Sequence, residues 1–263
     1  MVDIHLEALL KSGRFVKASP DIKQRLILAV VAQEGQGKTH FSFTAPDTIV
    51  TFNADFGLEG VIHKFIQQGK TILEYQVPMP NPQSRDVEKE AQKVWDDLEA
   101  AYDECLRNPS VRTIIFDTAT EIWEVVRLAY LGKLTEVMPH HYTAVNAQFR
   151  RFLKRADKTD KNLILLQKMK PTYVGKNATG DYEIAGFNDT PYIVQAVIFP
   201  HRAKVNTKLA DGTVVKKGEF YIEIGEKCRH NPAVSGTIFT GELANFPWVA
   251  ATILEGTDPS TFM

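Results

Sequence analysis

The sequence predicts an α/β protein with a mainly parallel central sheet flanked by helices. Short apolar runs of strand type alternate with longer stretches of helical periodicity, which is typical of a parallel sheet covered by helices. The glycine-bearing stretch Gly35-Gln36-Gly37 joins the first apolar run to a helix. The last third ends in a hairpin pattern, so we expect an antiparallel C-terminal extension of the same sheet.

Length and composition argue against a membrane-spanning protein, a secreted protein and a protein that is basic over its whole surface. The 263 residues have a net charge of −1, so a polyanion would be bound by a local patch rather than by the whole surface. No apolar run approaches the roughly 20 residues that cross a bilayer, and the N-terminus does not resemble a signal peptide. With two cysteines and no export signal, we expect a cytoplasmic protein that does not contact a membrane.

Domain boundaries are not marked in the sequence. No linker rich in Pro, Gly or Ser divides the chain. We therefore expect a single domain over residues 1–263, with a core at about 24–230 and terminal extensions at 1–23 and 235–263.

Five strands are expected in the parallel part of the sheet. Each run is short and rich in Ile, Val, Leu or Phe, as in strands that are buried on both faces. They are Leu26–Ala32, Thr48–Asn53, Thr71–Val77, Arg112–Phe116 and Leu163–Gln167.

The intervening and later segments complete the expected elements. Helices are predicted from Asp86, as a plausible N-cap, to Asn108, after Asp117, and over Tyr142–Ala156. In the C-terminal third, Ala196–Val205 and Gly218–Ile224 form strands around a turn signal. That signal is Asp211-Gly212.

The turn after the first strand has the composition of a phosphate-binding loop, or P-loop. Glycines let backbone N–H groups converge on phosphate oxygens, a lysine reaches the β- and γ-phosphates, and a Thr hydroxyl binds Mg²⁺. Ala32 stands where the usual motif has its first glycine. A chance Gly-Lys-Thr sequence is the alternative. The predicted nucleotide-binding residues for ATP–Mg²⁺ are Gln33, Glu34, Gly35, Gln36, Gly37, Lys38, Thr39 and His40.

Asp117 completes the predicted metal site. It follows the apolar run Thr113–Phe116, where P-loop proteins hold an acidic residue that binds Mg²⁺ through water. With the Thr39 hydroxyl, Asp117 is the predicted metal ligand. The alternative is that Asp117 caps the following helix.

Two further strand ends resemble those of the RecA family. Ile49–Asp55 is a strand that ends in an acidic residue directly after the P-loop helix, and the resemblance implies that Asp55 is the general base. The family more often has Glu there, and a turn residue is the alternative. The strand ending at Gln167 resembles the RecA strand whose Gln senses the γ-phosphate, which suggests the same role for Gln167. An ordinary polar strand end is the alternative.

The segment after Gln167 is the candidate DNA-binding region. In RecA proteins a basic stretch here becomes a DNA-binding loop, and Pro171–Asp189 has the polar composition of a mobile loop. Residues 150–217 contain 14 Lys or Arg and 6 Asp or Glu, which could also form a solvated helix face. Basic and aromatic groups pair with phosphates and stack on bases. The candidates are Lys168, Lys170, Tyr173 and Lys176.

The whole resemblance covers about residues 24–230. By resemblance, Lys227 and Arg229 would act in trans on the ATP of a neighbouring subunit, or they belong to a surface strand. The chain is most similar to short RecA-core ATPases of bacteriophages. That implies a single-stranded DNA-dependent ATPase for recombination, annealing or repair, which assembles as a ring or filament in the host cytoplasm. The alternatives are a small-molecule phosphotransferase, with residues 150–161 as a lid, and a nucleotide-gated assembly module.

Overall fold

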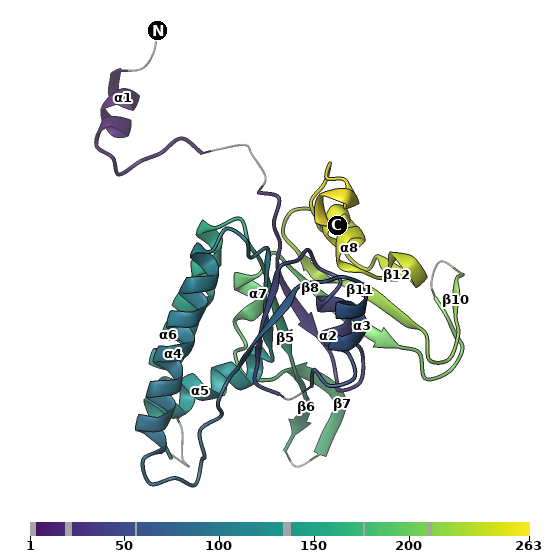
Figure 1. The fold of residues 1–263 in the computed structure, drawn as a ribbon, viewed down its shortest axis with the longest axis horizontal. Helices are drawn as coiled ribbons and strands as arrows, with labels where there is room; N and C mark the ends of the chain where they lie inside the picture. Colours follow the sequence, from purple (N-terminus) through teal and green to yellow (C-terminus); the bar gives the residue numbers. More distant parts are fainter. Residues whose placement is uncertain (1–3, 19–22, 56, 134–137, 176, 210–211) are drawn as a thin grey trace.

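An eight-stranded sheet runs through the molecule, with helices on both of its faces (Figure 1). The computed structural model describes residues 4–18, 23–55, 57–133, 138–175, 177–209 and 212–263. The strands of the main sheet are β1 (Ile27–Val31), β2 (Ile49–Asn53), β3 (Ile72–Gln76), β4 (Thr113–Asp117), β5 (Asn162–Gln167), β8 (Ala196–Arg202), β11 (Phe220–Cys228) and β12 (Ile238–Thr240).

The helices and two short ribbons fill the connections between these strands. The ribbons are β6 (Met169–Val174) with β7 (Asn177–Ile184), and β9 (Thr207–Lys208) with β10 (Val214–Val215). The α-helices are α1 (Ile4–Lys11), α2 (Lys38–Ser42), α3 (Ile62–Gln67), α4 (Val87–Arg107), α5 (Ala119–Leu131), α6 (Tyr142–Leu153), α7 (Thr190–Ile193) and α8 (Phe246–Ile253). Short 3₁₀ turns are η1 (Pro139–His141), η2 (Lys154–Lys158), η3 (Pro232–Val234), η4 (Gly241–Leu243) and η5 (Pro259–Phe262).

The sheet order is β12-β11-β8-β1-β5-β4-β2-β3. The strands from β8 to β3 are parallel, whereas β11 is antiparallel to both β8 and β12. β1 lies in the interior, with Ile27 opposite Leu163 and Leu28 opposite Ala196. The predicted parallel α/β sheet with an antiparallel C-terminal extension is therefore confirmed.

Alternation along β1 divides the core into two layers. Ile27, Ala29 and Val31 face the layer formed by α4, α5 and α6, whereas Leu28 and Val30 face the layer of α2 and α8. These five side chains are fully buried, because a central strand is covered on both faces. The sequence run from 26 to 32 is apolar throughout for this reason.

The C-terminal segment, predicted as a terminal extension, packs into the core. Asn245 caps α8 by accepting a hydrogen bond from the Trp248 N–H, and Phe246, Val249 and Ile253 are buried. In Figure 1, α8 lies on the opposite side of the sheet from α4 and α6. Among the described residues, no helix is both long and apolar enough to span a bilayer.

The predicted strands and helices are confirmed, with differences at their ends and edges. β3 was expected to be buried on both faces, but it is one of the two edge strands of the sheet, and Leu73 is 54% exposed. α6 ends at Leu153 and continues as the 3₁₀ turn η2. α4 follows Asp86, although the Asp86 side chain makes no capping hydrogen bond.

The segment predicted as a mobile loop after β5 is instead the β6–β7 hairpin. Lys170 is paired with Glu183 and Tyr173 with Ala178 in this antiparallel ribbon. β7 is exposed along nearly its whole length, so no alternation of apolar and polar residues marks it in the sequence. In the other predicted turn, Asp211 lies outside the described residues, whereas Gly212 has a φ of 89°.

Candidate nucleotide-binding site

The loop between β1 and α2 has the backbone conformation that its glycines permit. Gly35 and Gly37 have φ values of 73° and 92°, in the left-handed region that other residues rarely adopt. A Cβ atom built on Gly37 would lie 2.7 Å from Cε2 of Phe220. Both the backbone and the neighbouring ring therefore require glycine at position 37, directly before α2.

Lys38 is held inside this loop. Its Nζ donates to the carbonyl oxygens of Ala32 and Gln33, each at 3.0 Å. Burial lowers the pKa of Lys38, while the carboxylates of Asp117 and Asp55 act in the opposite direction. The two carbonyl oxygens hold the ammonium group of Lys38 inside a loop of backbone N–H donors. The ammonium group and these N–H groups can together bind phosphate oxygens.

Thr39 and Asp117 meet at the predicted metal position. The Thr39 hydroxyl donates to Oδ2 of Asp117 at 2.9 Å, although the two residues are 78 positions apart. Burial raises the pKa of Asp117 to about 6, and the hydrogen bond from Thr39 partly offsets this. A hydroxyl and a buried carboxylate are hard oxygen ligands, so this pair fits Mg²⁺.

Asp117 is not the cap of the following helix. It is the last residue of β4, and Thr118 occupies the N-cap of α5, where its hydroxyl accepts a hydrogen bond from the Glu121 N–H. The capping alternative for Asp117 is therefore wrong. The sequence places an acid at the strand end and a separate cap immediately after it.

A cavity of about 790 Å³ surrounds these groups. It lies at the carboxyl ends of the parallel strands, where open α/β sheets bind their ligands. The residues that line it are Ala32, Gln33, Glu34, Gly35, Gly37, Lys38, Thr39, His40, Asp55, Gly57, Gly60, Val61, Lys64, Asp117, Thr118, Lys168, Met169 and Arg202.

Most of the predicted nucleotide-binding residues are among these. Gln36 is the exception, because its Oε1 accepts a hydrogen bond from the Arg202 N–H at 2.7 Å. His40 lines the cavity and also packs against Phe65 and Phe220. Its pKa is lowered by burial and by the nearby cations Lys64 and Arg202.

Asp55, the predicted general base, faces the cavity and is bound to Lys168. Nζ of Lys168 lies 3.0 Å from Oδ1 of Asp55 and 2.7 Å from Oε1 of Glu121. Burial alone would lower the pKa of Lys168, but the hydrogen bonds to Glu121 and Asp55 outweigh it and raise the pKa. Lys168, predicted to contact DNA, is thus placed in the cavity as a cation between two carboxylates.

Gln167, the predicted sensor, is not among the cavity-lining residues. Its side chain is fully buried, and Nε2 donates to Oγ1 of Thr190 at 2.7 Å. Within the described part of the chain, its Oε1 has no hydrogen-bond partner. In this structure Gln167 joins β5 to α7, and the adjacent Lys168 reaches the cavity instead.

The other predicted DNA-binding residues lie on the β6–β7 hairpin. Lys170 forms an ion pair with Glu183 at 3.1 Å, and the Tyr173 side chain is 61% exposed. Lys176 falls outside the described residues. Met169 and Lys168 line the cavity, so the hairpin begins at the cavity wall.

Lys227 and Arg229 lie far from the cavity of their own chain. Lys227 is near the end of β11, where Cys228 pairs with Ala196 at the beginning of β8. The guanidinium of Arg229 donates to the carbonyl oxygen of Tyr192 at 3.1 Å. Both residues are therefore at the end of the sheet opposite the P-loop.

Sequence reasoning missed four polar residues of this site. Glu121 binds Lys168, and Thr118, Lys64 and Arg202 line the cavity. Thr118 was detectable because it directly follows Asp117. Arg202 comes from the end of β8, and only the fold brings that strand to the P-loop, so no local pattern marks it.

A family model described as an AAA domain matches residues 24–209, which is more than half of the chain. The chain belongs to this AAA-domain family. The matched region contains β1, the P-loop, Asp117 and the β6–β7 hairpin. An AAA-type P-loop ATPase domain implies nucleotide binding, typically together with Mg²⁺.

Comparisons with individual proteins add little to the AAA domain match. No curated protein matches the sequence. Among solved structures, the chain is similar to a prototypical ATPase from the type III secretion system of pathogenic bacteria, with 16% identity and a TM-score of 0.41. The similarity covers 71% of this chain and 53% of that one, so this chain spans about half the length of that protein.

Proposed function

We propose that this AAA domain hydrolyses ATP and acts on single-stranded DNA in recombination, annealing or repair. The observation that carries the proposal is the continuity between the cavity and the β6–β7 hairpin. Lys168 touches the predicted general base at the cavity wall, and Lys170 and Tyr173 follow within one exposed ribbon. The state of the nucleotide can therefore act on the hairpin surface that carries Lys170 and Tyr173.

The side chains around the cavity have distinct roles in the proposed reaction. The loop from Gly35 to Lys38 would hold the triphosphate, and Thr39 with Asp117 would hold Mg²⁺. Bound Mg²⁺ supplies positive charge that balances the phosphates. Asp55 would orient the attacking water, and its hydrogen bond to Lys168 holds its carboxylate at the cavity wall.

Coupling to DNA would proceed through the residues at the end of β5. A phosphate group near Lys168 competes with Asp55 and Glu121 for its ammonium group, because all three are anions. A shift of Lys168 moves the first residue pairs of the hairpin. We propose that Gln167 follows this motion through its hydrogen bond to Thr190, which makes it an indirect sensor rather than a phosphate ligand.

Assembly into a ring or filament is part of the proposal. Lys227 and Arg229 lie at the end of the sheet opposite the P-loop, so a neighbouring copy could present them to the nucleotide. The resemblance to short bacteriophage recombination ATPases supports this arrangement, in the host cytoplasm if a phage encodes the chain. By contrast, residues 150–158 lie on α6 and η2 and line no part of the cavity, which disfavours the phosphotransferase alternative with a lid there.

The test is ATP hydrolysis by the full chain with and without a single-stranded oligonucleotide. The proposal predicts strong stimulation by DNA, which is lost when Lys170 and Tyr173 are both replaced by Ala, while turnover without DNA is retained. Replacement of the exposed Lys93 by Ala is the matched control. Slow turnover that DNA does not change would support a nucleotide-gated assembly module, and phosphate transfer to a metabolite would support a kinase; either result would refute the proposal.

A further inference from the structure

A second strongly basic site lies away from the nucleotide cavity, in an open groove of about 640 Å³ between α4 and α6. The helices α4 and α6 are at the left of the molecule in Figure 1, on the side of the sheet opposite α8. Six of its ten lining residues are cations and one is an acid. The lining residues are Asp103, Leu106, Arg107, Ala147, Arg150, Arg151, Lys154, Arg155, Lys158 and Thr159.

Five of these cations form a single row. Positions 150, 151, 154, 155 and 158 recur at the spacing that places side chains on one face of a helix. The row crosses from α6 into the 3₁₀ turn η2 and spans roughly 14 Å at the rises of these two helix types, and one strand of duplex DNA has a phosphate about every 3.4 Å along its axis. The row is therefore long enough for several successive phosphates.

Three of the six cations form no ion pair within the part of the chain that the structure describes. Arg150 pairs with Asp189, Arg151 with Glu99, and Arg155 with Glu99 and Asp103. In contrast, the remaining three cations are exposed and form no ion pair with any described residue; they are Arg107, Lys154 and Lys158. This positive charge is available to a ligand.

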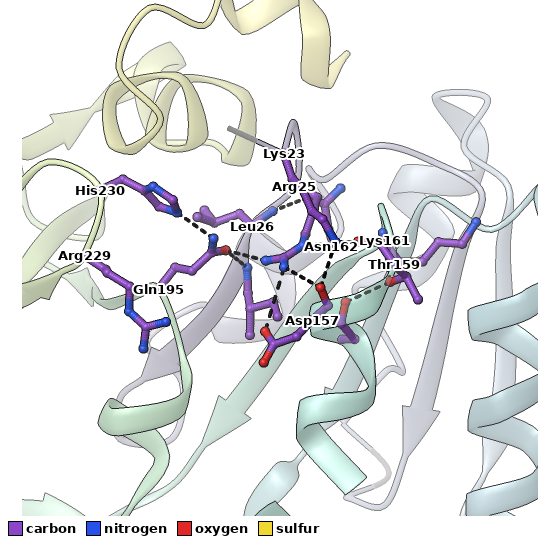
Figure 2. Close-up of polar contacts among 12 residues, drawn as sticks. Lys23, Arg25, Leu26, Asp157, Thr159, Lys161, Asn162, Gln195, Arg229 and His230 are labelled. Carbon is purple, nitrogen blue, oxygen red and sulfur yellow. Dashed lines mark hydrogen bonds and ion pairs between the residues drawn. The ribbon is translucent and has the colours of Figure 1, made fainter. Parts of the chain in front are cut away.

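The acid within η2 is turned away from the groove. Figure 2 shows Asp157 beside Arg25, where Nη2 of Arg25 lies 3.8 Å from Oδ1 of Asp157 and donates to the Asp157 carbonyl oxygen at 3.2 Å. Lys23 donates to the same carbonyl at 2.8 Å, and Arg25 is in turn fixed by Gln195 at 3.0 Å. This network anchors η2 to the residues that directly precede β1 and β8, and it leaves Lys154 and Lys158 on the groove side.

We infer that this groove binds the phosphate backbone of a nucleic acid, as a second contact in addition to the β6–β7 hairpin. Arginine and lysine side chains bind phosphate oxygens strongly. Only Leu106 and Ala147 are apolar in the lining, which is less apolar surface than a protein partner's interface core requires. No aromatic residue lines the groove, so it contacts phosphates without base stacking and does not select sequence.

The inference rests on the proposed action on DNA and extends it to the groove. The groove variant replaces Arg107, Lys154 and Lys158 by Ala. The control variant replaces Lys93, Lys208 and Lys217, which are also exposed, and changes the net charge by the same amount. The hairpin variant is Lys170→Ala with Tyr173→Ala. Thermal unfolding and ATP turnover without DNA check that each variant is folded.

The measurement is the affinity of the full chain for a fluorescent 40-residue oligo(dT) with ATP and Mg²⁺, titrated over the salt concentration. With three fewer phosphate contacts, the slope of log K against log salt should become shallower by about 2 in the groove variant. Between 50 and 200 mM salt, the wild type should then lose about 20-fold more affinity than that variant. The control variant should follow the wild type.

Each outcome decides between the groove and the hairpin. Weaker binding with a shallower salt slope in the groove variant supports the inference. It does so even if the hairpin variant binds DNA normally, a result that would exclude the hairpin as a DNA-binding site. A groove variant that binds like the control overturns the inference, whereas loss in the hairpin variant alone leaves the proposed function standing. If the wild type does not bind oligo(dT), both the groove inference and the proposed function are overturned. The same holds if the wild type binds polyglutamate or anionic vesicles as tightly as oligo(dT).

Discussion

Replacement of Asp117 by Asn should stabilise the metal-free protein near neutral pH. Asp117 is 3% exposed at the end of β4, and burial raises the pKa of its carboxyl group to about 6. The amide oxygen of the new side chain could still accept the Thr39 hydrogen bond. The substitution therefore removes a buried charge while it retains the local contact.

The size and pH dependence follow from the two pKa values. The folded pKa of Asp117 lies above the unfolded value of 3.8, so its contribution to stability is present at low pH and is lost as the pH rises through about 6. A pKa raised from 3.8 to about 6 corresponds to about 3 kcal/mol when Asp117 is fully ionised. The stability difference between the Asp117→Asn variant and the wild-type protein should grow from below about 1 kcal/mol near pH 4 to about 3 kcal/mol near pH 7.

Urea unfolding in EDTA, followed by circular dichroism between pH 4 and pH 8, measures this difference. Asp160→Asn is the control, because that carboxylate is 89% exposed and its removal should change stability by no more than about 0.5 kcal/mol. A variant less stable than the wild type at pH 7, or a difference that does not change with pH, would refute the account of Asp117 as a strained, buried carboxylate. Added Mg²⁺ and nucleotide should stabilise the wild type more than the variant.

Three further substitutions test the loop and the cavity. Lys38→Ala should weaken nucleotide binding at least about tenfold in a fluorescence titration, with Lys93→Ala as control; equal affinities would exclude the P-loop assignment. Gly37→Ala should lower the melting temperature more than Gly35→Ala, because both positions have positive φ but only Gly37 abuts an aromatic ring; equal melting temperatures would contradict this geometry. Lys168→Met should reduce ATP turnover by about 10- to 100-fold with nucleotide affinity nearly unchanged, and normal turnover would remove Lys168 from the site.

The sequence predicted those parts of the molecule in which local pattern and burial agree. The interior strands were found because both of their faces are covered, which makes runs such as 26–32 continuously apolar. The P-loop and Asp117 were found because phosphate and metal chemistry requires particular residue types directly after such strands. The sequence did not show whether Asp117 or Thr118 caps α5; the backbone conformation assigns the cap to Thr118.

Other parts depend on contacts that no local pattern records. The edge position of β3 follows from sheet order, and the solvated β6–β7 ribbon has no apolar face to detect. Lys168 reaches Asp55 across 113 positions of sequence, and Gln167 turns to Thr190 instead of the cavity. The basic groove is likewise visible only once α4 lies against α6 and Arg25 holds Asp157.

A crystal structure with Mg²⁺ and a non-hydrolysable ATP analogue tests the central claim most directly. We expect the phosphates to lie against the N–H groups from Gly35 to Lys38, with Nζ of Lys38 moved from the carbonyls of Ala32 and Gln33 to the β- and γ-phosphates. The metal should lie about 2.1 Å from Oγ1 of Thr39. A nucleotide bound elsewhere, or a metal on the far side of the sheet from Asp117, would contradict the account.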